Sequence, residues 1–299
     1  MNEVAIIGCG PAGIAAAIYL KRAGFDPLVF EKHEIGGLLK NANLVENYPG
    51  FPEGIGGKEL VELFKDQLHR LEVQVKRDEV NTVNYKKGIF SLNTQKYKYR
   101  TNMVIIATGT IPKGIDLKGQ SDLIGKKLFY EIKDIPRPKR KDTYVVIGGG
   151  DAAFDYALNL AKDVERVDII YRGKKPKCLP LLEERVNKNQ NIHVHPKTAP
   201  MAVEEMGDQI TIKFMSDEKK IAFTSDYALI ACGREPNLGI LSDEIERSLK
   251  IKEDGSTNFP GLFFAGDVRR GEFRQTGIAV GDGILCAMWA VKLLKGEDE

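Results

Sequence analysis

The stretch Gly8-Cys9-Gly10-Pro11-Ala12-Gly13 follows the apolar run 4–7 and opens a segment with helical periodicity. The stretch Gly148-Gly149-Gly150-Asp151-Ala152-Ala153 repeats this arrangement after the apolar run 144–147. A strand, a tight glycine turn and a helix start form a binding site for a pyrophosphate, because glycines let the backbone approach the phosphates and the helix N-terminus favours negative charge. Two such turns in one chain predict two bound dinucleotides.

The two sites differ in the residue that would meet the adenosine ribose, for which an acid is expected about 20 positions beyond the turn. Glu31 lies 23 positions after Gly8 (31 − 8), whereas the same offset from Gly148 reaches Tyr171 (171 − 148). A basic cluster follows Tyr171, made of Arg172, Lys174, Lys175 and Lys177. A carboxylate suits a free ribose diol and a basic cluster suits a 2′-phosphate, so the second site favours NADPH.

Composition and charge narrow the class of protein. A chain of 299 residues, 42% hydrophobic and 29% charged, is long enough for two globular domains. Its net charge of +2 does not indicate a nucleic-acid or membrane partner. The four cysteines (Cys9, Cys178, Cys232 and Cys286) are far apart and show no metal-ligand spacing, so we expect no metal site. Isolated thiols, no recognisable signal peptide and a longest apolar helix over only 12–20 predict a cytoplasmic protein.

The order of elements predicts an α/β fold with two Rossmann-like dinucleotide-binding domains, each with three layers (ββα), the second inserted into the first. The buried run 103–109 is echoed by 228–233, which completes an internal duplication. We expect a discontinuous first domain over 1–111 and 236–299, and an inserted domain over 112–235. Short alternating runs at 73–75, 88–92 and 96–99 predict a small antiparallel piece.

The chain resembles the low-molecular-weight thioredoxin reductases, which are pyridine nucleotide-disulfide oxidoreductases, over nearly its whole length. The matching stretches are 8–13, 45–50, 107–109, 148–153, 264–269 and 274–275. The resemblance implies a flavoprotein oxidoreductase with FAD in the split domain, NADPH in the inserted domain (NADH remaining open), and a homodimer.

The residues expected at FAD combine the first glycine turn with positions matched to the family. They are Gly8, Gly10, Pro11, Ala12, Gly13, Glu31, Lys32, Gly37, Leu38, Asn47, Ala107, Thr108, Gly109, Gly266, Asp267, Arg274, Gln275 and Thr276. The resemblance places Glu31 at the adenosine ribose, Asp267 at the ribityl chain, and Asn47 and Gln275 beside the flavin ring. The residues expected at NADPH are Gly148, Gly150, Asp151, Ala152, Ala153, Arg172, Lys174, Lys175, Lys177 and Gly233.

One departure from the family concerns its chemistry. Those enzymes pass electrons to a C-x-x-C disulfide upstream of the second glycine turn. Here Glu131 and Asp134 occupy these positions, 17 and 14 residues before Gly148 (148 − 131 and 148 − 134), and neither carries electrons. Two interpretations are a pair of proton donors at the flavin or, as we favour, a surface helix or loop. We expect electrons to pass from NADPH through FAD directly to an external acceptor: a ferredoxin or flavodoxin, a quinone or another small oxidant.

Two alternatives remain open. Gly173 stands where the family has an arginine, so the NADPH site could be vestigial, with ferredoxin or another donor feeding a flavin that reduces a disulfide. The protein could also be a non-catalytic flavin-binding sensor. Among electron acceptors, a ferredoxin is the first hypothesis, and the basic run 137–141 is either its docking surface or a charged turn between domains.

Overall fold

The computed structural model describes residues 2–296, which divide into two compact units. Unit 1 comprises residues up to 40, 45–111 and from 235 onward, and unit 2 comprises 41–44 and 112–234. The short segment 41–44, which follows the first nucleotide-binding region in sequence, therefore clusters with unit 2. Sequence alone gave no indication of this assignment.

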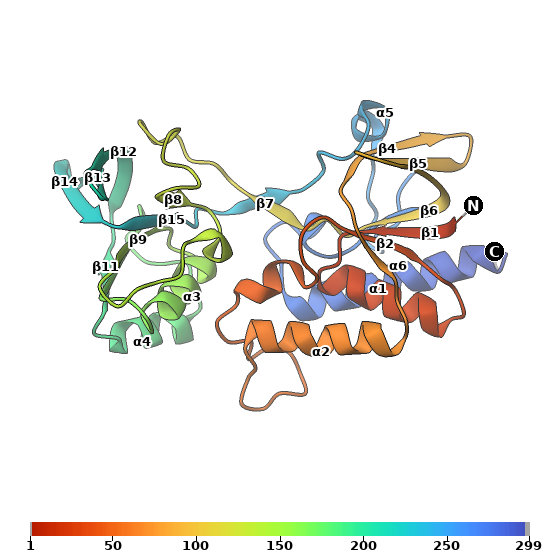
Figure 1. The fold of residues 1–299 in the computed structure, drawn as a ribbon, viewed down its shortest axis with the longest axis horizontal. Coiled ribbons are helices and arrows are strands. Elements are labelled where there is room, and N and C mark those ends of the chain that lie inside the picture. Colours follow the sequence, from red (N-terminus) through yellow and green to blue (C-terminus); the bar gives the residue numbers. More distant parts are fainter. Residues whose placement is uncertain (1, 297–299) are drawn as a thin grey trace. The chain divides into compact units, whose positions relative to one another are not determined.

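Unit 1 is built around a seven-stranded sheet in the order β3-β2-β1-β6-β5-β4, with β17 also paired to β6. The strands β3, β2, β1, β6 and β17 are parallel, and β5 pairs antiparallel with β6. Its elements are β1 (Asn2–Ile7), α1 (Pro11–Arg22), β2 (Leu28–Glu31), η1 (Gly37–Asn41), α2 (Gly57–Arg70), β3 (Val75–Arg77), β4 (Val80–Lys86), β5 (Ile89–Thr94), β6 (Lys98–Ile106), α5 (Asp243–Ser248), β17 (Leu262–Phe264), η3 (Gly266–Val268) and α6 (Thr276–Leu294). Figure 1 shows α1, α2 and α6 on one face of the parallel strands and, on the other side, the antiparallel strands β4 and β5, which continue the sheet from β6. These are the three expected layers.

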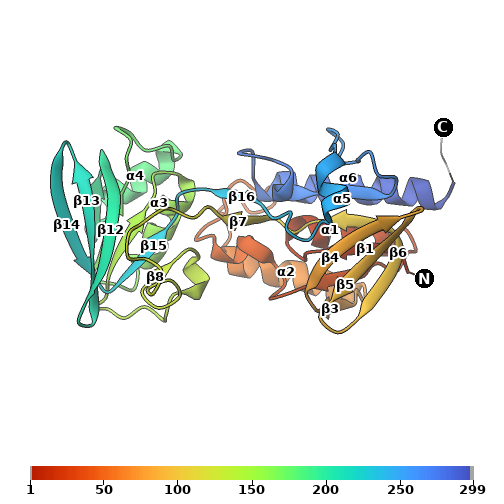
Figure 2. The same ribbon diagram turned by 90° about the horizontal axis from the view of Figure 1, so that it is seen from above.

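Unit 2 repeats this plan. Its elements are β8 (Leu128–Phe129), η2 (Ile132–Asp134), β9 (Thr143–Ile147), α3 (Asp151–Leu160), β10 (Arg166–Ile170), α4 (Pro180–Lys188), β11 (Ile192–His195), β12 (Thr198–Met206), β13 (Gln209–Ser216), β14 (Lys219–Ser225) and β15 (Tyr227–Ile230). The parallel sheet runs β11-β10-β9-β15-β8. The antiparallel sheet β12-β13-β14 forms a separate layer (Figure 2). A two-stranded ribbon of β7 (Thr110–Pro112) and β16 (Arg234–Pro236) carries the two crossovers of the chain.

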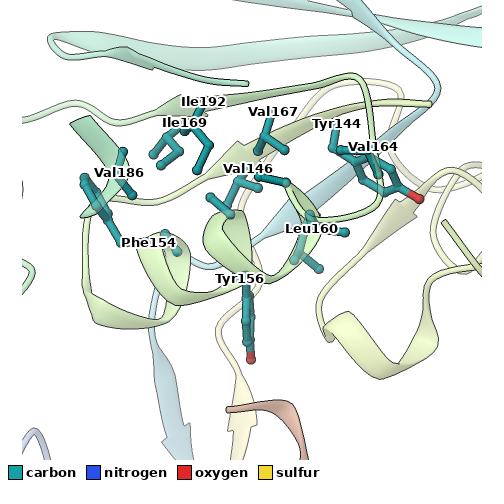
Figure 3. Close-up of a cluster of buried hydrophobic side chains, with 14 of the residues drawn as sticks. Tyr144, Val146, Phe154, Tyr156, Leu160, Val164, Val167, Ile169, Val186 and Ile192 are labelled. Atoms are coloured by element: carbon teal, nitrogen blue, oxygen red, sulfur yellow. The ribbon is translucent and has the colours of Figure 1, made fainter. Parts of the chain in front are cut away.

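The core of unit 2 lies on both faces of its parallel sheet. Between the sheet and helices α3 and α4 pack Val146, Phe154, Leu160 and Ile169, all at most 2% exposed (Figure 3). A second cluster, which includes Phe214, fills the space between the sheet and the β12-β13-β14 layer. Because both faces are covered, the strands read as continuous apolar runs, as is typical of buried parallel strands.

The glycine turn of unit 1 is required by close backbone approach. Gly8 has φ +101°, and a Cβ there would lie 2.3 Å from the carbonyl oxygen of Ala107. A Cβ at Gly13 would lie 1.9 Å from the carbonyl oxygen of Gly8. The turn from β1 into α1 therefore packs directly on the end of β6, and any side chain at these two positions would separate them.

Two expectations were wrong. The run 73–75 does not join an antiparallel piece: β3 pairs in parallel with β2, Val29 opposite Val75. The longest apolar helix is α6, not the segment 12–20. By length and mean hydropathy (1.6) alone, α6 could cross a membrane, and 39% of its apolar stretch is buried inside the protein. Within unit 1 this helix packs along α1, and a Cβ at Gly283 would lie 2.1 Å from the carbonyl oxygen of Ala12. It is thus a packed helix of unit 1.

Candidate functional site

The first cradle is shaped by Glu31 at the end of β2. Its Oε2 accepts a 2.9 Å hydrogen bond from the backbone N–H of Cys9, and its Oε1 accepts one of 2.9 Å from the N–H of His33. The carboxylate is therefore fixed beside the glycine turn. Each carboxylate oxygen has two acceptor positions, so both can still receive a ribose hydroxyl. The backbone of Gly37 lies against the same turn, since a Cβ at Gly37 would lie 3.2 Å from the Cα of Gly10.

A cavity of about 320 Å³ opens at this cradle, within the size range of ligand pockets. Four expected residues line it: Gly8, Glu31, Lys32 and Thr108. The sequence did not indicate the rest of the lining. Ile7 and Phe30 lie near the ends of β1 and β2, and the other residues come from the segment that links β3 to the start of β4 (78–81) and from Asn237, Gly239 and Ile240 after the second crossover. The pocket lies beside the helix N-terminus and contains a fixed ribose acceptor, so the residues present fit the adenosine half of FAD.

The second crossover is joined to this pocket by two hydrogen bonds. The hydroxyl of Thr108 donates to the carbonyl oxygen of Asn237 at 2.7 Å, and the N–H of Asn237 donates to the carbonyl oxygen of Gly109 at 3.0 Å. The expected turn 107–109 and the residues after the crossover thereby form one wall. The sequence indicated the turn 107–109, but it did not indicate Asn237, which lies 129 positions after Thr108.

The residues expected at the flavin end also lie in unit 1. Asn47 Nδ2 donates a 2.8 Å hydrogen bond to Gln275 Oε1, so the two expected neighbours of the ring are brought together. Gly266 and Asp267 lie in η3, Arg274 is half-buried, and Thr276 begins α6. Leu38 lies in η1 and is half-buried.

The second cradle has the same construction. A Cβ at Gly148 would lie 2.3 Å from the carbonyl oxygen of Ala231, while a Cβ at Gly150 would meet nothing within 4 Å. The turn thus packs on the end of β15 and leaves its third glycine open, before the ten-residue helix α3. Ala152 and Ala153 form the first turn of that helix, and Asp151 Oδ1 accepts a 2.8 Å hydrogen bond from the N–H of Leu179.

The basic segment 172–177 is held against this turn by the backbone. The N–H of Lys177 donates to the carbonyl oxygen of Gly149 at 2.6 Å, and the N–H of Lys197 donates to the carbonyl oxygen of Gly173 at 2.9 Å. Arg172, Lys174, Lys175 and Lys177 are all exposed. Gly173 thus has a backbone role in the structure. An open glycine turn with exposed cations beside it fits the phosphates of NADPH.

Glu131 is not on the surface, so that expectation was wrong for this residue. It is 7% exposed, and its Oε1 accepts a 2.6 Å hydrogen bond from Arg234 Nη1. Its Oε2 accepts one of 3.0 Å from Asn41 Nδ2, and the Tyr156 hydroxyl lies 3.5 Å away. In Figure 3 the ring of Tyr156, a member of the buried cluster, extends away from the other labelled side chains. Asp134, at the end of η2, is exposed as expected. The two carboxylates are therefore not equivalent.

All four cysteines are free thiols. Burial, and secondarily the Glu31 charge, raises the pKa of Cys9 to about 12, and burial raises the pKa of Cys286 to about 12. Burial also raises the pKa of Cys178 to about 11 and that of Cys232, which the nearby Arg172 opposes. Since the thiolate is the reactive form, none has the depressed pKa of an activated cysteine. Within residues 2–296, no three His, Cys, Asp or Glu side chains gather as metal ligands do.

Two dinucleotide cradles, one with a ribose-binding carboxylate and one with a basic segment, define a flavoprotein that exchanges electrons with a nicotinamide dinucleotide. The pyridine nucleotide-disulphide oxidoreductase family model matches residues 2–283, and the chain belongs to this family. It is a flavin- and NAD(P)H-dependent oxidoreductase similar to thioredoxin reductases, and the cofactors are FAD and NADPH.

Individual relatives support this assignment. The chain is 33% identical to the thioredoxin reductase of Treponema pallidum, covering 95% of this chain and 94% of the relative. It is 30% identical to the NADPH-dependent thioredoxin reductase 3 of Arabidopsis thaliana, but spans only 58% of that protein's length. Among solved structures, the thioredoxin reductase of Lactococcus lactis superimposes with a TM-score of 0.89 at 30% identity, covering 99% of this chain and 100% of that chain.

Proposed function

We propose that this protein passes electrons from NADPH through FAD to an external acceptor without a dithiol of its own. The observation that supports the proposal is that Glu131, which the resemblance places at the first family cysteine, is a buried carboxylate paired with Arg234. When bound, FAD and NADPH supply the hydride transfer. The chain's own residues hold the two dinucleotides: Glu31 fixes the adenosine end of one, and the backbone bond from Lys177 keeps the cations of the second cradle in place.

The decisive experiment is an anaerobic titration of the FAD-loaded protein with NADPH. FAD alone takes up two electrons, so one NADPH per FAD should complete the reduction, whereas a flavin with a redox-active disulfide needs two. The double variant Cys178→Ser, Cys232→Ser should give the same endpoint. An endpoint of two NADPH per FAD, or thioredoxin turnover that the double variant loses, would contradict the proposal.

For the acceptor we propose a small acidic redox protein of the ferredoxin or flavodoxin class. Support comes from the turn 137–141, in which Arg137, Lys139, Arg140 and Lys141 are exposed. The N–H of Lys139 donates to Asp142 Oδ2 at 2.8 Å, which shapes the turn and directs its cations outward. Such a patch accelerates encounter with an acidic partner in a salt-dependent manner. Charge reversal at Arg137, Lys139 and Arg140 should slow ferredoxin reduction at low ionic strength while reduction of a neutral quinone is unchanged.

We also propose a homodimer formed through α6, in a reducing, cytoplasmic environment. Ile278, Leu285 and Met288 share one face of the helix and are 37%, 36% and 48% exposed. Contiguous exposed apolar side chains of this kind mark association surfaces. The free thiols support the reducing environment. Sedimentation of wild type and Met288→Glu tests the dimer: the wild type should sediment as a dimer and the variant as a monomer.

A further inference from the structure

The carboxylate of Asp282, on α6, has every acceptor position filled. Its Oδ2 accepts from the N–H of Gly266 at 3.1 Å and from Arg270 Nε at 2.8 Å. Its Oδ1 accepts from Arg269 Nη1 at 3.1 Å and from Arg270 Nη2. An ionised carboxylate offers about four such positions. Asp282 is 3% exposed and has no capacity left to bind a ligand directly.

What Asp282 holds is the turn η3, which carries Asp267 of the FAD site. Gly266 has φ +77°, and a Cβ there would lie 2.9 Å from the Cβ of Ala12 and 3.4 Å from that of Ala279. The turn therefore lies between the first turn of α1, which opens from the glycine cradle, and α6. A displacement of Gly266 would move Asp267, the next residue, relative to the cradle.

Two cations depend on this one carboxylate. The side chain of Arg269 is 6% exposed, and its Nε is buried without a hydrogen-bond partner among the described residues. Its Nη2 donates to the carbonyl oxygens of Lys252 (2.8 Å) and Glu253. Hydrogen bonding to Asp282 raises the pKa of Arg270. Without the carboxylate, two guanidinium groups would repel each other directly behind η3.

We infer that Asp282 is a positioning residue for FAD: it fixes η3 through Gly266 and the two arginines, and does not touch the cofactor. This inference concerns the established FAD dependence and is independent of the electron acceptor proposed above. It predicts that a change at Asp282 weakens and perturbs flavin binding in a protein that remains folded.

The test replaces the carboxylate by its isosteric amide, Asp282→Asn. The amide nitrogen cannot accept a hydrogen bond, so at least one of the bonds from the arginines is lost, and both guanidinium groups lose the negative charge of the carboxylate. We expect the Kd for FAD, measured by fluorescence in refolded apoprotein well below its Tm, to rise about tenfold or more. The visible absorption bands of the bound flavin should shift. The matched control is Asp243→Asn, which removes the exposed ion pair with Arg247 in α5 and should change neither readout.

A lower Tm with wild-type Kd and flavin spectrum would overturn the inference, because Asp282 would then support only the fold. If Asp282→Asn does not fold, Arg270→Gln replaces it, since Arg270 is 34% exposed and its loss leaves Arg269 paired with the carboxylate. That variant should raise the Kd for FAD severalfold and shift the flavin bands. An unchanged Kd and spectrum in Arg270→Gln would equally reject the role.

Discussion

Glu131 Oε1 lies 2.6 Å from Arg234 Nη1, and the two side chains are only 10% and 19% exposed. Glu131 directly precedes η2, and Arg234 is the first residue of β16 in the crossover ribbon. The pair therefore links two segments that lie 103 positions apart in the sequence. Glu131, which the resemblance to thioredoxin reductases places at a cysteine position, is thus part of a mostly buried ion pair.

Removing the charge at Glu131 should destabilise the protein. Glu131→Gln removes the carboxylate charge from its ion pair with the largely buried guanidinium of Arg234. Breaking a buried ion pair typically costs 3–5 kcal/mol, so we expect a loss of about 3 kcal/mol in the free energy of unfolding. Urea denaturation measures it. Asp134→Asn is the control, because Asp134 is the exposed one of the two carboxylates that the resemblance places at the cysteine positions. It should change the free energy of unfolding by less than about 0.5 kcal/mol. Equal effects of the two substitutions would contradict the distinction between them.

Substitutions at two glycines of the first turn should affect different properties: one the stability of the apoprotein, the other the affinity for FAD. Gly8→Ala forces a Cβ to 2.3 Å from the carbonyl oxygen of Ala107 at φ +101°, so the apoprotein should lose about 1–3 kcal/mol of stability or more. Gly10→Ala meets nothing closer than 3.9 Å at φ −81°, so the apoprotein should keep its stability. Its new methyl group enters the cradle, and the Kd for FAD should rise. Wild-type FAD affinity in Gly10→Ala would place the pyrophosphate elsewhere.

The basic segment 172–177 should discriminate between the two nicotinamide dinucleotides. Arg172→Gln and Lys177→Gln each remove one charged donor for the 2′-phosphate, so the Kd for NADPH should rise about tenfold while that for NADH stays constant. Isothermal titration measures both constants. Lys188→Gln, which breaks an exposed pair with Glu184 in α4, is the control. If both variants bind NADPH and NADH as the wild type does, the segment is only a solvated loop and the vestigial-site alternative gains support.

Asp155 gives a pH dependence of stability with a defined sign. Burial, opposed by the hydrogen bond from the N–H of Asn43, raises its pKa from 3.8 to about 6. The folded state then binds the proton more tightly than the unfolded state, so this group lowers stability fully above pH 6 and progressively less as the pH falls towards 3.8. Asp155→Asn should therefore raise Tm most above pH 6, and its advantage should shrink between pH 6 and 4. A gain in Tm that is independent of pH would contradict this assignment.

Much of the fold was readable because its signals are local. The glycine turns, their preceding strands and the spacing from Gly8 to Glu31 each depend on one β-α-β unit, in which neighbouring residues determine the geometry. The burial of Glu131 was not readable, because its partners Asn41 and Arg234 lie 90 and 103 positions away.

The same limit applies to parts of the FAD site. The side of the pocket formed by 78–81 and by Asn237, Gly239 and Ile240 depends on how two segments that are far apart in the sequence meet. Asp282 stands alone in an apolar helix and resembles an ordinary exposed acid until its two arginines are placed beside it.

The assignment of 41–44 to unit 2 affects how this protein can be dissected. A fragment cut at residues 112 and 234 would keep Glu131 and Asp155 but lose Asn41 and Asn43, and with them two hydrogen-bond donors to partly or fully buried carboxylates. An autonomous nicotinamide-binding module would need residues 41–44 added back to it. A cut at the two ends of the inserted segment alone would therefore not yield a complete unit 2.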